Sequence, residues 1–173
     1  MTPQDYEAYA KNIYKDNAAE VLARFPAAST EEVPAAYSRM FTIMSFAAGA
    51  LHAADTTTAN NSPVYMYKFT RIPDTMLKMF GSFHGLEIFY LFGNFMVRII
   101  SIPDTPADAS LSQDIMKYWS NFAKTGNPNA PGLPDWPVYS ADKGQYIELG
   151  EHVAASAGIY EEYRELINQV TGK

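Results

Sequence analysis

One short strand constrains this chain more than any other feature of its sequence. Residues 64–70 follow a turn cluster, read Val-Tyr-Met-Tyr-Lys-Phe-Thr, and are apolar on both faces apart from Lys68. This pattern is typical of a strand in a sheet that is covered on both sides. Such a strand needs neighbours, because each unpaired buried N–H or C=O group costs about 1–3 kcal/mol.

The sequence offers few neighbours for this strand. A parallel partner requires a crossover of a dozen or more residues, and the only other strand that we predict is a minor one over about 145–149. We therefore expect that residues 64–70 lie at a sheet edge or pair with a strand outside this chain. The chain is thus predicted to be part of a domain rather than a whole one.

The rest of the chain is predicted to be mostly helical. Thr2 and Pro3 suit the start of the first helix. A later helix, from Pro34 towards His52, is expected to be weakened in its middle by Thr42, Ser45 and Gly49 and can divide in two.

Two further helices complete the prediction. One opens at Ser110 with capping-box spacing and stops at Gly126, and the last runs from about Ser156 to Val170. We find no inter-domain linker, so the chain is taken as one segment. Its parts are a helical region (1–62), a strand with the loop that follows (63–100), and helices with a Pro-rich loop (101–173).

Composition excludes several classes of protein. Thirteen Lys and Arg against nineteen Asp and Glu give a net charge of -6, which argues against nucleic-acid binding. With 47% hydrophobic and 18% charged residues the chain is not disordered. The absence of Cys excludes a disulfide scaffold and a Cys nucleophile. The longest apolar runs fall short of the roughly 20 residues needed to span a membrane, and the start lacks a signal-peptide pattern, which favours the cytoplasm.

Three segments resemble the C-terminal part of the type B carboxylesterase and cholinesterase family. Residues 83–93 read Phe-His-Gly-Leu-Glu-Ile-Phe-Tyr-Leu-Phe-Gly and are similar to its His-Gly-x-Glu segment. Residues 111–129 contain Tyr-Trp-Ser-Asn-Phe-Ala-Lys-Thr-Gly-Asn-Pro-Asn, and residues 133–139 read Leu-Pro-Asp-Trp-Pro-Val-Tyr. The resemblance implies an α/β fold of the α/β-hydrolase type, of which this chain supplies the C-terminal third.

The resemblance also implies a site. The family hydrolyses carboxylic esters with a Ser-His-Glu triad, and His84 matches its histidine, the general base. From the pattern alone, a single His is more often structural than catalytic. Gly85 and Glu87 are expected to support the loop, with Glu87 buried and hydrogen-bonded, and Phe83 and Leu86 to line a substrate pocket. No cofactor is implied, and His84 with Glu87 offers too few ligands for a metal.

The sequence departs from the family in lacking a Gly-x-Ser-x-Gly elbow and an oxyanion loop. We therefore expect that the remaining, N-terminal part of the domain supplies the nucleophile and the acid, and that this chain alone is inactive. Two alternatives are a non-catalytic partner-binding module of the same superfamily and a fragment that folds by itself without activity. The exposed strand could also form a homodimer.

A group of aromatic residues has two interpretations. Tyr118, Trp119, Phe122 and Trp136 could form a ligand cage, but the helical spacing of the first three favours packing in the core.

Overall fold

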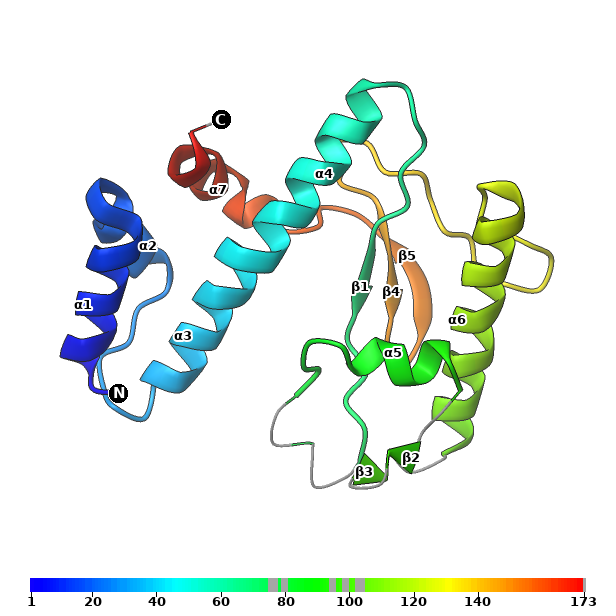
Figure 1. The fold of residues 1–173 in the computed structure, drawn as a ribbon, viewed down its shortest axis with the longest axis horizontal. Helices are drawn as coiled ribbons and strands as arrows, with labels where there is room; N and C mark the ends of the chain where they lie inside the picture. Colours follow the sequence, from blue (N-terminus) through cyan, green and yellow to red (C-terminus); the bar gives the residue numbers. More distant parts are fainter. Residues whose placement is uncertain (75–77, 79–80, 94–95, 98–99, 102–104, 173) are drawn as a thin grey trace. The chain divides into compact units, whose positions relative to one another are not determined.

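The computed structural model describes residues 1–172 except 75–77, 79–80, 94–95, 98–99 and 102–104 (Figure 1). The chain forms two compact units. Unit 1 comprises Met1–Ser62 and Tyr160–Lys173, and unit 2 comprises Pro63–Ile159. The C-terminal residues thus belong with the N-terminal helices and not with the strand region that precedes them in the sequence.

Unit 1 is helical, and its first helix begins as expected. The side chain of Thr2 accepts a hydrogen bond from the amide of Asp5 at 3.2 Å, and Asp5 in turn accepts one from the amide of Thr2 at 2.9 Å. This capping box satisfies two backbone donors that would otherwise lack partners. The helices of unit 1 are α1 (Pro3–Tyr14), α2 (Ala18–Arg24), α3 (Val33–Phe41), α4 (Ala48–Ala59) and α7 (Arg164–Thr171).

The middle of the long helix does not break. A π-helical turn over Thr42–Ala47 joins α3 to α4, so that the chain stays helical from Val33 to Ala59. The residues expected to weaken this stretch include Thr42 and Ser45, which lie in the π turn. The sequence therefore predicted the position of an irregularity in the helix, but this irregularity widens the helix and does not end it.

Aromatic contacts bring the C-terminal residues onto α2. The ring of Tyr163 stacks on Phe25 with centroids 5.4 Å apart, and the guanidinium of Arg24 lies 5.0 Å from the centre of the same ring. Tyr6 of α1 also donates a hydrogen bond to the carbonyl of Phe25 at 2.8 Å.

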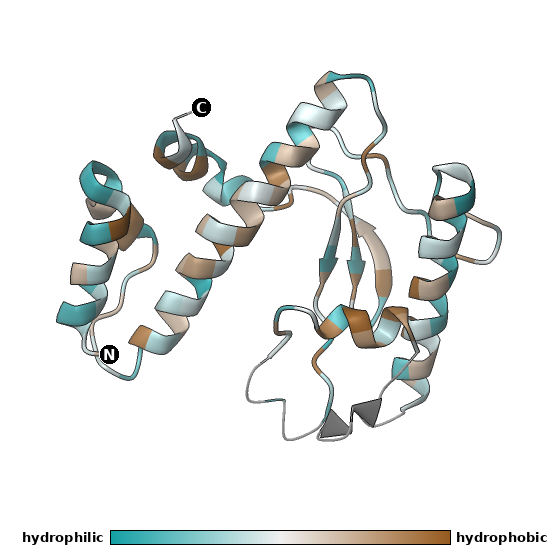
Figure 2. Ribbon diagram, in the orientation of Figure 1, coloured by the Kyte–Doolittle hydropathy of each residue, from teal (hydrophilic) through white to brown (hydrophobic). Residues whose placement is uncertain are grey.

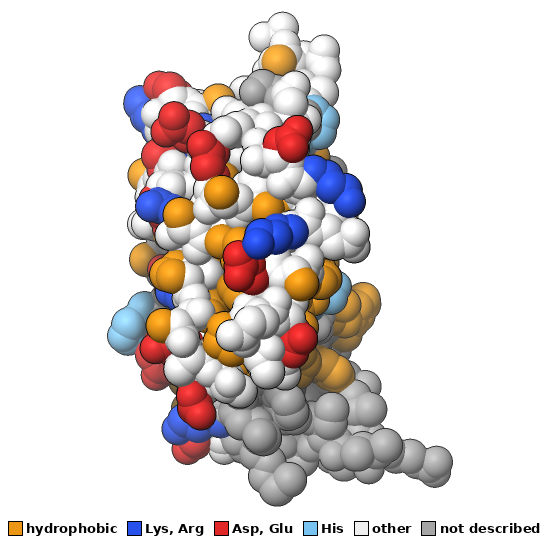
Figure 3. All heavy atoms as spheres, turned by 90° about the vertical axis from the view of Figure 1, so that its left-hand side faces the viewer, with side chains coloured by type: hydrophobic (Ala, Val, Ile, Leu, Met, Phe, Trp, Pro, Cys, Tyr) orange, Lys and Arg blue, Asp and Glu red, His pale blue; other side chains and the backbone are white. Residues whose placement is uncertain are grey.

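On the face drawn in Figure 3, acidic, basic and hydrophobic side chains are interspersed.

Unit 2 contains a three-stranded sheet in the order β1-β4-β5. Its strands are β1 (Tyr67–Phe69), β4 (Tyr146–Leu149) and β5 (Val153–Ser156). β1 runs parallel to β4, with Tyr67 opposite Ile147, and β5 is antiparallel to β4. A separate pair, β2 (Met96–Val97) and β3 (Ile100–Ser101), is antiparallel.

The parallel pairing corrects one expectation. The chain does contain a neighbour for β1: the carbonyl of Met66 accepts from the amide of Ile147 at 3.0 Å, and the amide of Thr70 donates to Leu149 at 2.9 Å. The predicted minor strand over 145–149 provides it, after a crossover that includes α5 (Leu86–Leu91) and α6 (Pro106–Thr125). As described, β1 is the edge strand of this sheet.

Both crossover helices bury apolar side chains against the sheet. Figure 2 shows α5 as hydrophobic over most of its length. α6 begins at Pro106, earlier than the predicted Ser110, because Thr105 caps it by accepting from the amide of Asp108 at 3.1 Å. The buried cluster of unit 2 consists of Leu86, Tyr90, Leu111, Ile115, Tyr118, Trp136, Ile147 and Leu149.

The last predicted helix is shorter than expected. β5 occupies the chain up to Ser156, and α7 starts only at Arg164, after a 3-10 turn over Glu161–Tyr163. Gly158 and Tyr160 between them have positive φ angles of 73° and 56°, which a helix cannot contain.

No helix among the described residues has both the length and the apolar character needed to cross a membrane.

Gly150, between β4 and β5, leads to a first prediction. A Cβ atom at this position would lie 2.2 Å from Oγ1 of Thr70, which donates to the carboxylate of Glu148 at 2.8 Å. We expect Gly150→Ala to lower the free energy of unfolding by about 1–3 kcal/mol, because the strands must separate or the hydrogen bond must break. Urea unfolding followed by circular dichroism measures this change.

Gly49→Ala serves as the matched control for this prediction. Gly49 lies in α4, and a Cβ there meets no atom within 4 Å. Alanine is therefore expected to raise the stability by about 0.5–1 kcal/mol, since it favours the helical backbone. Equal changes in the unfolding free energy of the two variants would show that the contact with Thr70 does not restrict the size of the side chain at position 150.

Candidate functional site

His84 lies in a tight turn between β1 and α5. The turn spans Phe83–Leu86, which we call the histidine turn, and is closed by a hydrogen bond from the amide of Leu86 to the carbonyl of Phe83 at 3.1 Å. Gly85 has φ 84° and ψ 0°, the values of the third residue of a type II turn. This conformation favours glycine. The side chain of His84, which precedes Gly85, is exposed.

The histidine turn is attached to the carboxyl end of β1. The hydroxyl of Ser82 donates to the carbonyl of Phe69, the last residue of β1, at 3.1 Å. In open α/β sheets, ligands bind beyond the carboxyl ends of parallel strands. β1 and β4 form such a parallel pair, so the exposed imidazole lies at the end of the sheet where functional sites are found.

The other predicted site residues take different positions. Glu87 is half-buried rather than buried, and none of the hydrogen bonds recorded for the described residues involves its carboxylate. Burial and, second, the charge of Glu87 raise the pKa of Tyr67, which places this carboxylate near β1. Its predicted support of the loop stays a prediction, as does that of Gly85.

Leu86 and Phe83 both face the core. Leu86 is fully buried in the apolar cluster of unit 2, and Phe83 is half-buried against the same cluster. Their predicted contact with a substrate stays a prediction, and in this structure their packing holds the histidine turn on the core.

The site includes a buried charge that the sequence did not reveal. Asp108, in the first turn of α6, is completely buried and accepts hydrogen bonds from Nε of Arg71 at 2.7 Å, the hydroxyl of Tyr90 at 2.9 Å and Oγ1 of Thr105 at 2.6 Å. We call these four residues the Asp108 network. Arg71 also pairs with Glu151.

The network fixes the ionisation of its members. Burial alone would raise the pKa of Asp108, but the hydrogen bonds from Arg71, Thr105 and Tyr90 outweigh burial and lower it. The hydrogen bond to Asp108 raises the pKa of Arg71, and burial raises the pKa of Tyr90. Asp108 is therefore a carboxylate and Arg71 a cation at neutral pH.

One signal for this network was present in the sequence. Thr105 and Asp108 have the spacing of a helix cap, which locates Asp108 in a first turn. Nothing in the sequence pairs Asp108 with Arg71 or Tyr90, because these residues come from three separate elements.

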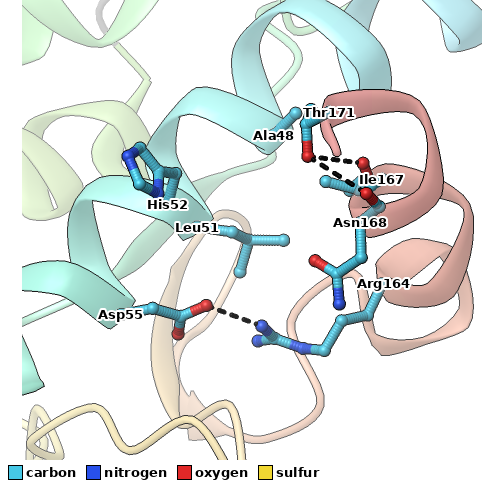
Figure 4. Close-up of a pocket in the computed structure, with 8 residues that line it drawn as sticks. All are labelled: Ala48, Leu51, His52, Asp55, Arg164, Ile167, Asn168 and Thr171. Carbon is cyan, nitrogen blue, oxygen red and sulfur yellow. Dashed lines mark hydrogen bonds and ion pairs between the residues drawn. The ribbon is translucent and has the colours of Figure 1, made fainter. Parts of the chain in front are cut away.

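Two pockets lie in unit 1. A cavity of about 30 Å³ between α4 and α7 has room for about one water molecule. Figure 4 shows Asp55 and Arg164 at its side, paired at 2.9 Å. An open groove between α2 and α7 is lined mainly by exposed charged side chains, among them Glu20, Glu162 and Glu165. Neither has the apolar, enclosed character of a binding site for an ester.

Metal ligands are not clustered among the described residues. No group of three or more His, Asp or Glu side chains in that part of the chain could hold an ion.

Known proteins resemble this chain over most of its length. The model of the carboxylesterase family matches residues 2–166. Liver carboxylesterase of Sus scrofa is 40% identical over 100 residues, which are 55% of this chain and 17% of that protein. The medium-chain fatty acyl-CoA hydrolase precursor of Anas platyrhynchos is 35% identical over 114 residues, 64% of this chain and 20% of that protein.

Solved structures agree with the sequence relatives. Two structures of PNB esterase superpose with TM-scores of 0.74 and 0.77 at 24% and 25% identity, and each covers 96% of this chain. The chain spans about a third of the length of these enzymes, which have the α/β-hydrolase fold. The family model and the fold of the solved structures agree on one assignment: the chain belongs to the carboxylesterase family.

Proposed function

We propose that this chain is the C-terminal part of a serine carboxylesterase, in which His84 is the general base. The observation that carries the proposal is the exposed His84 in a type II turn at the carboxyl end of a parallel strand pair. The name of one relative, a liver carboxylesterase, supports carboxylic esters as the substrate class.

The imidazole would act as a base and then as an acid in each half of the turnover. In the first half it accepts the proton of a serine hydroxyl while the serine oxygen attacks the ester carbonyl, and it gives that proton to the leaving alcohol, which leaves the acyl group on the serine. In the second half it accepts a proton from a water molecule that attacks the acyl carbonyl, and it returns that proton to the serine oxygen as the carboxylic acid leaves. An acidic residue at the other ring nitrogen would hold the imidazole in the required tautomer. The serine and the acid come from a further stretch of polypeptide, and the reaction needs no cofactor.

The edge of β1 is the proposed contact with that stretch. The carbonyl of Met66 and the amide of Thr70 point to β4. Because the backbone groups of successive residues in a strand point to alternate edges, the amide and the carbonyl of Tyr67 point to the opposite edge. A strand from the N-terminal part of the same domain would pair there. A second copy of this chain is the other partner that such an edge accepts, and a dimer in sedimentation would reveal it.

The proposal is tested by replacing His84 in the complete native gene product. We expect His84→Ala to lower kcat for p-nitrophenyl acetate by about 10²–10⁴-fold, because the serine loses its base. His152→Gln is the matched control: it removes an exposed histidine from the turn between β4 and β5 and should leave kcat unchanged. Full activity of His84→Ala would refute the proposal and favour the non-catalytic module.

The 173-residue chain alone should hydrolyse the same ester no faster than free imidazole. Its intact native mass distinguishes the possible origins of the missing groups. A mass near 19 kDa would mean that the cell makes this piece alone, whereas a mass roughly three times larger would mean that this chain is part of a longer protein.

A further inference from the structure

The segment that carries His84 is attached at both ends to one carboxylate. Arg71 follows β1 and Tyr90 lies in α5, so that His84 falls between them in the chain. Both side chains donate to the same oxygen of Asp108, Arg71 at 2.7 Å and Tyr90 at 2.9 Å. Asp108 therefore joins the two sides of this segment through a single atom.

The attachment at Tyr90 has a second component. Ser112, one turn after Asp108 on α6, is buried and donates to the backbone carbonyl of Tyr90 at 2.6 Å. The side chain and the backbone of Tyr90 are thus both bonded to α6. Since Tyr90 is completely buried, neither bond competes with water.

α5 connects Tyr90 rigidly to the histidine turn. Leu86 and Tyr90 lie four residues apart on one face of this helix, and both are completely buried in the cluster with Leu111 and Ile115 of α6. The amide of Ile88 bonds to the carbonyl of Gly85 at 3.2 Å, and the helix begins directly after Gly85, the residue that follows His84. A shift of α5 on α6 would therefore move the imidazole.

We propose that Asp108 is a positioning residue for His84: through Arg71 and Tyr90 it fixes the histidine turn relative to β1 and α6. This inference rests on the proposed function of His84 for its effect on catalysis, but not for its effect on the turn. Asp108 itself is buried and does not reach the reacting atoms. Its lowered pKa is consistent with a permanent negative charge that both donors require.

Amide hydrogen exchange of the 173-residue chain tests the effect on the turn. In Asp108→Asn we expect the amide of Leu86, which closes the histidine turn, and the amide of Ile88, which bonds to Gly85, to exchange about tenfold faster than in the original chain. The amide of Ile147, bonded across the sheet to Met66, should change much less. An ion pair that only stabilises unit 2 would accelerate all three amides by the same factor.

Kinetics of the complete gene product test the effect on catalysis. Asp108→Asn should lower kcat for p-nitrophenyl acetate by up to about 100-fold with KM unchanged, because a small displacement of a catalytic group is sufficient for such a loss. Asp114→Asn is the matched control, since it removes the same charge from the same helix and Asp114 forms an ion pair with Lys117 of that helix. It should change neither exchange nor kcat.

If Asp108→Asn does not fold, Tyr90→Phe replaces it, since this variant removes one hydroxyl and keeps the ring in the core. Equal acceleration of the three amides, or an unchanged kcat, would overturn the inference. Failure of the proposed function has a different signature, because His84→Ala would then remain active while the exchange experiment, which needs no substrate, still reports on Asp108.

Discussion

Replacing Arg71 by methionine is expected to lower the free energy of unfolding of unit 2 by about 3–5 kcal/mol at neutral pH. The side chain of Arg71 is 11% exposed and pairs with the completely buried Asp108. Methionine keeps much of the apolar stem but leaves a buried carboxylate without its cation. Urea unfolding followed by tryptophan fluorescence measures the loss, because Trp119 and Trp136, the two tryptophans of the chain, both lie in unit 2.

The effect of Arg71→Met should depend on pH with a definite sign. In the original chain the pKa of Asp108 is lowered, so its contribution to stability is present above the ordinary carboxyl pKa and is lost as the pH falls through the lowered value. Without the cation, burial raises the pKa, and the charged form opposes folding. The difference in stability between the two proteins should therefore shrink on acidification.

An exposed ion pair provides the control for this experiment. Lys11 pairs with Glu7 one turn away at 2.7 Å, and both side chains are mostly exposed. Lys11→Met should have little effect, since solvent screens such pairs. Unfolding of this variant is followed by circular dichroism, because Lys11 lies in unit 1 and both tryptophans lie in unit 2. A stability difference for Arg71→Met that stays constant on acidification would contradict the assignment of the loss to the charge of Asp108.

Trp136→Ala is expected to cost about 3–5 kcal/mol of stability, as large-to-small substitutions of buried aromatic residues do. The indole is 4% exposed, donates from Nε1 to the carbonyl of Met66 at 2.8 Å, and lies 5.2 Å from the ring of Tyr118. Its loss leaves a cavity beside β1 and removes a hydrogen bond to that strand. The fluorescence of Trp119 and circular dichroism follow unfolding of the variant.

Phe122→Ala is the matched control for Trp136→Ala. Phe122 belongs to the same aromatic group, but it is 49% exposed and touches the edge of Tyr65. Its removal should cost far less, because little of its surface leaves water on folding. Similar losses in the two variants would show that Trp136 is not central to the core of unit 2.

The helical spacing of the aromatic residues predicted part of this core correctly. Tyr118 is buried where the period of α6 places it, and Trp136 joins it from the Pro-rich loop. Asn129 fixes that loop by bonding to both backbone groups of Trp136, at 2.9 Å and 2.7 Å. Phe122 shows the limit of the spacing argument, because a position on the stripe near a helix end can remain exposed.

The pairing of β1 with β4 was harder to predict from the sequence. A local pattern indicates that a segment is extended, but it does not identify a partner that is distant in the chain. The same limit applies to the site. His84 could be located by its motif, whereas Asp108, Arg71 and Tyr90 meet only after α5 and α6 have packed on the sheet.

The parallel register of Tyr67 with Ile147 has a consequence for synthesis on the ribosome. β1 leaves the exit tunnel long before β4, so for much of translation its backbone groups have no strand of this chain to bond. Contacts between such distant segments form slowly, and an unpaired strand is prone to aggregation meanwhile. The rate of translation between the codons of β1 and those of β4, and the chaperones present during that interval, should therefore influence how much of this protein reaches its native state.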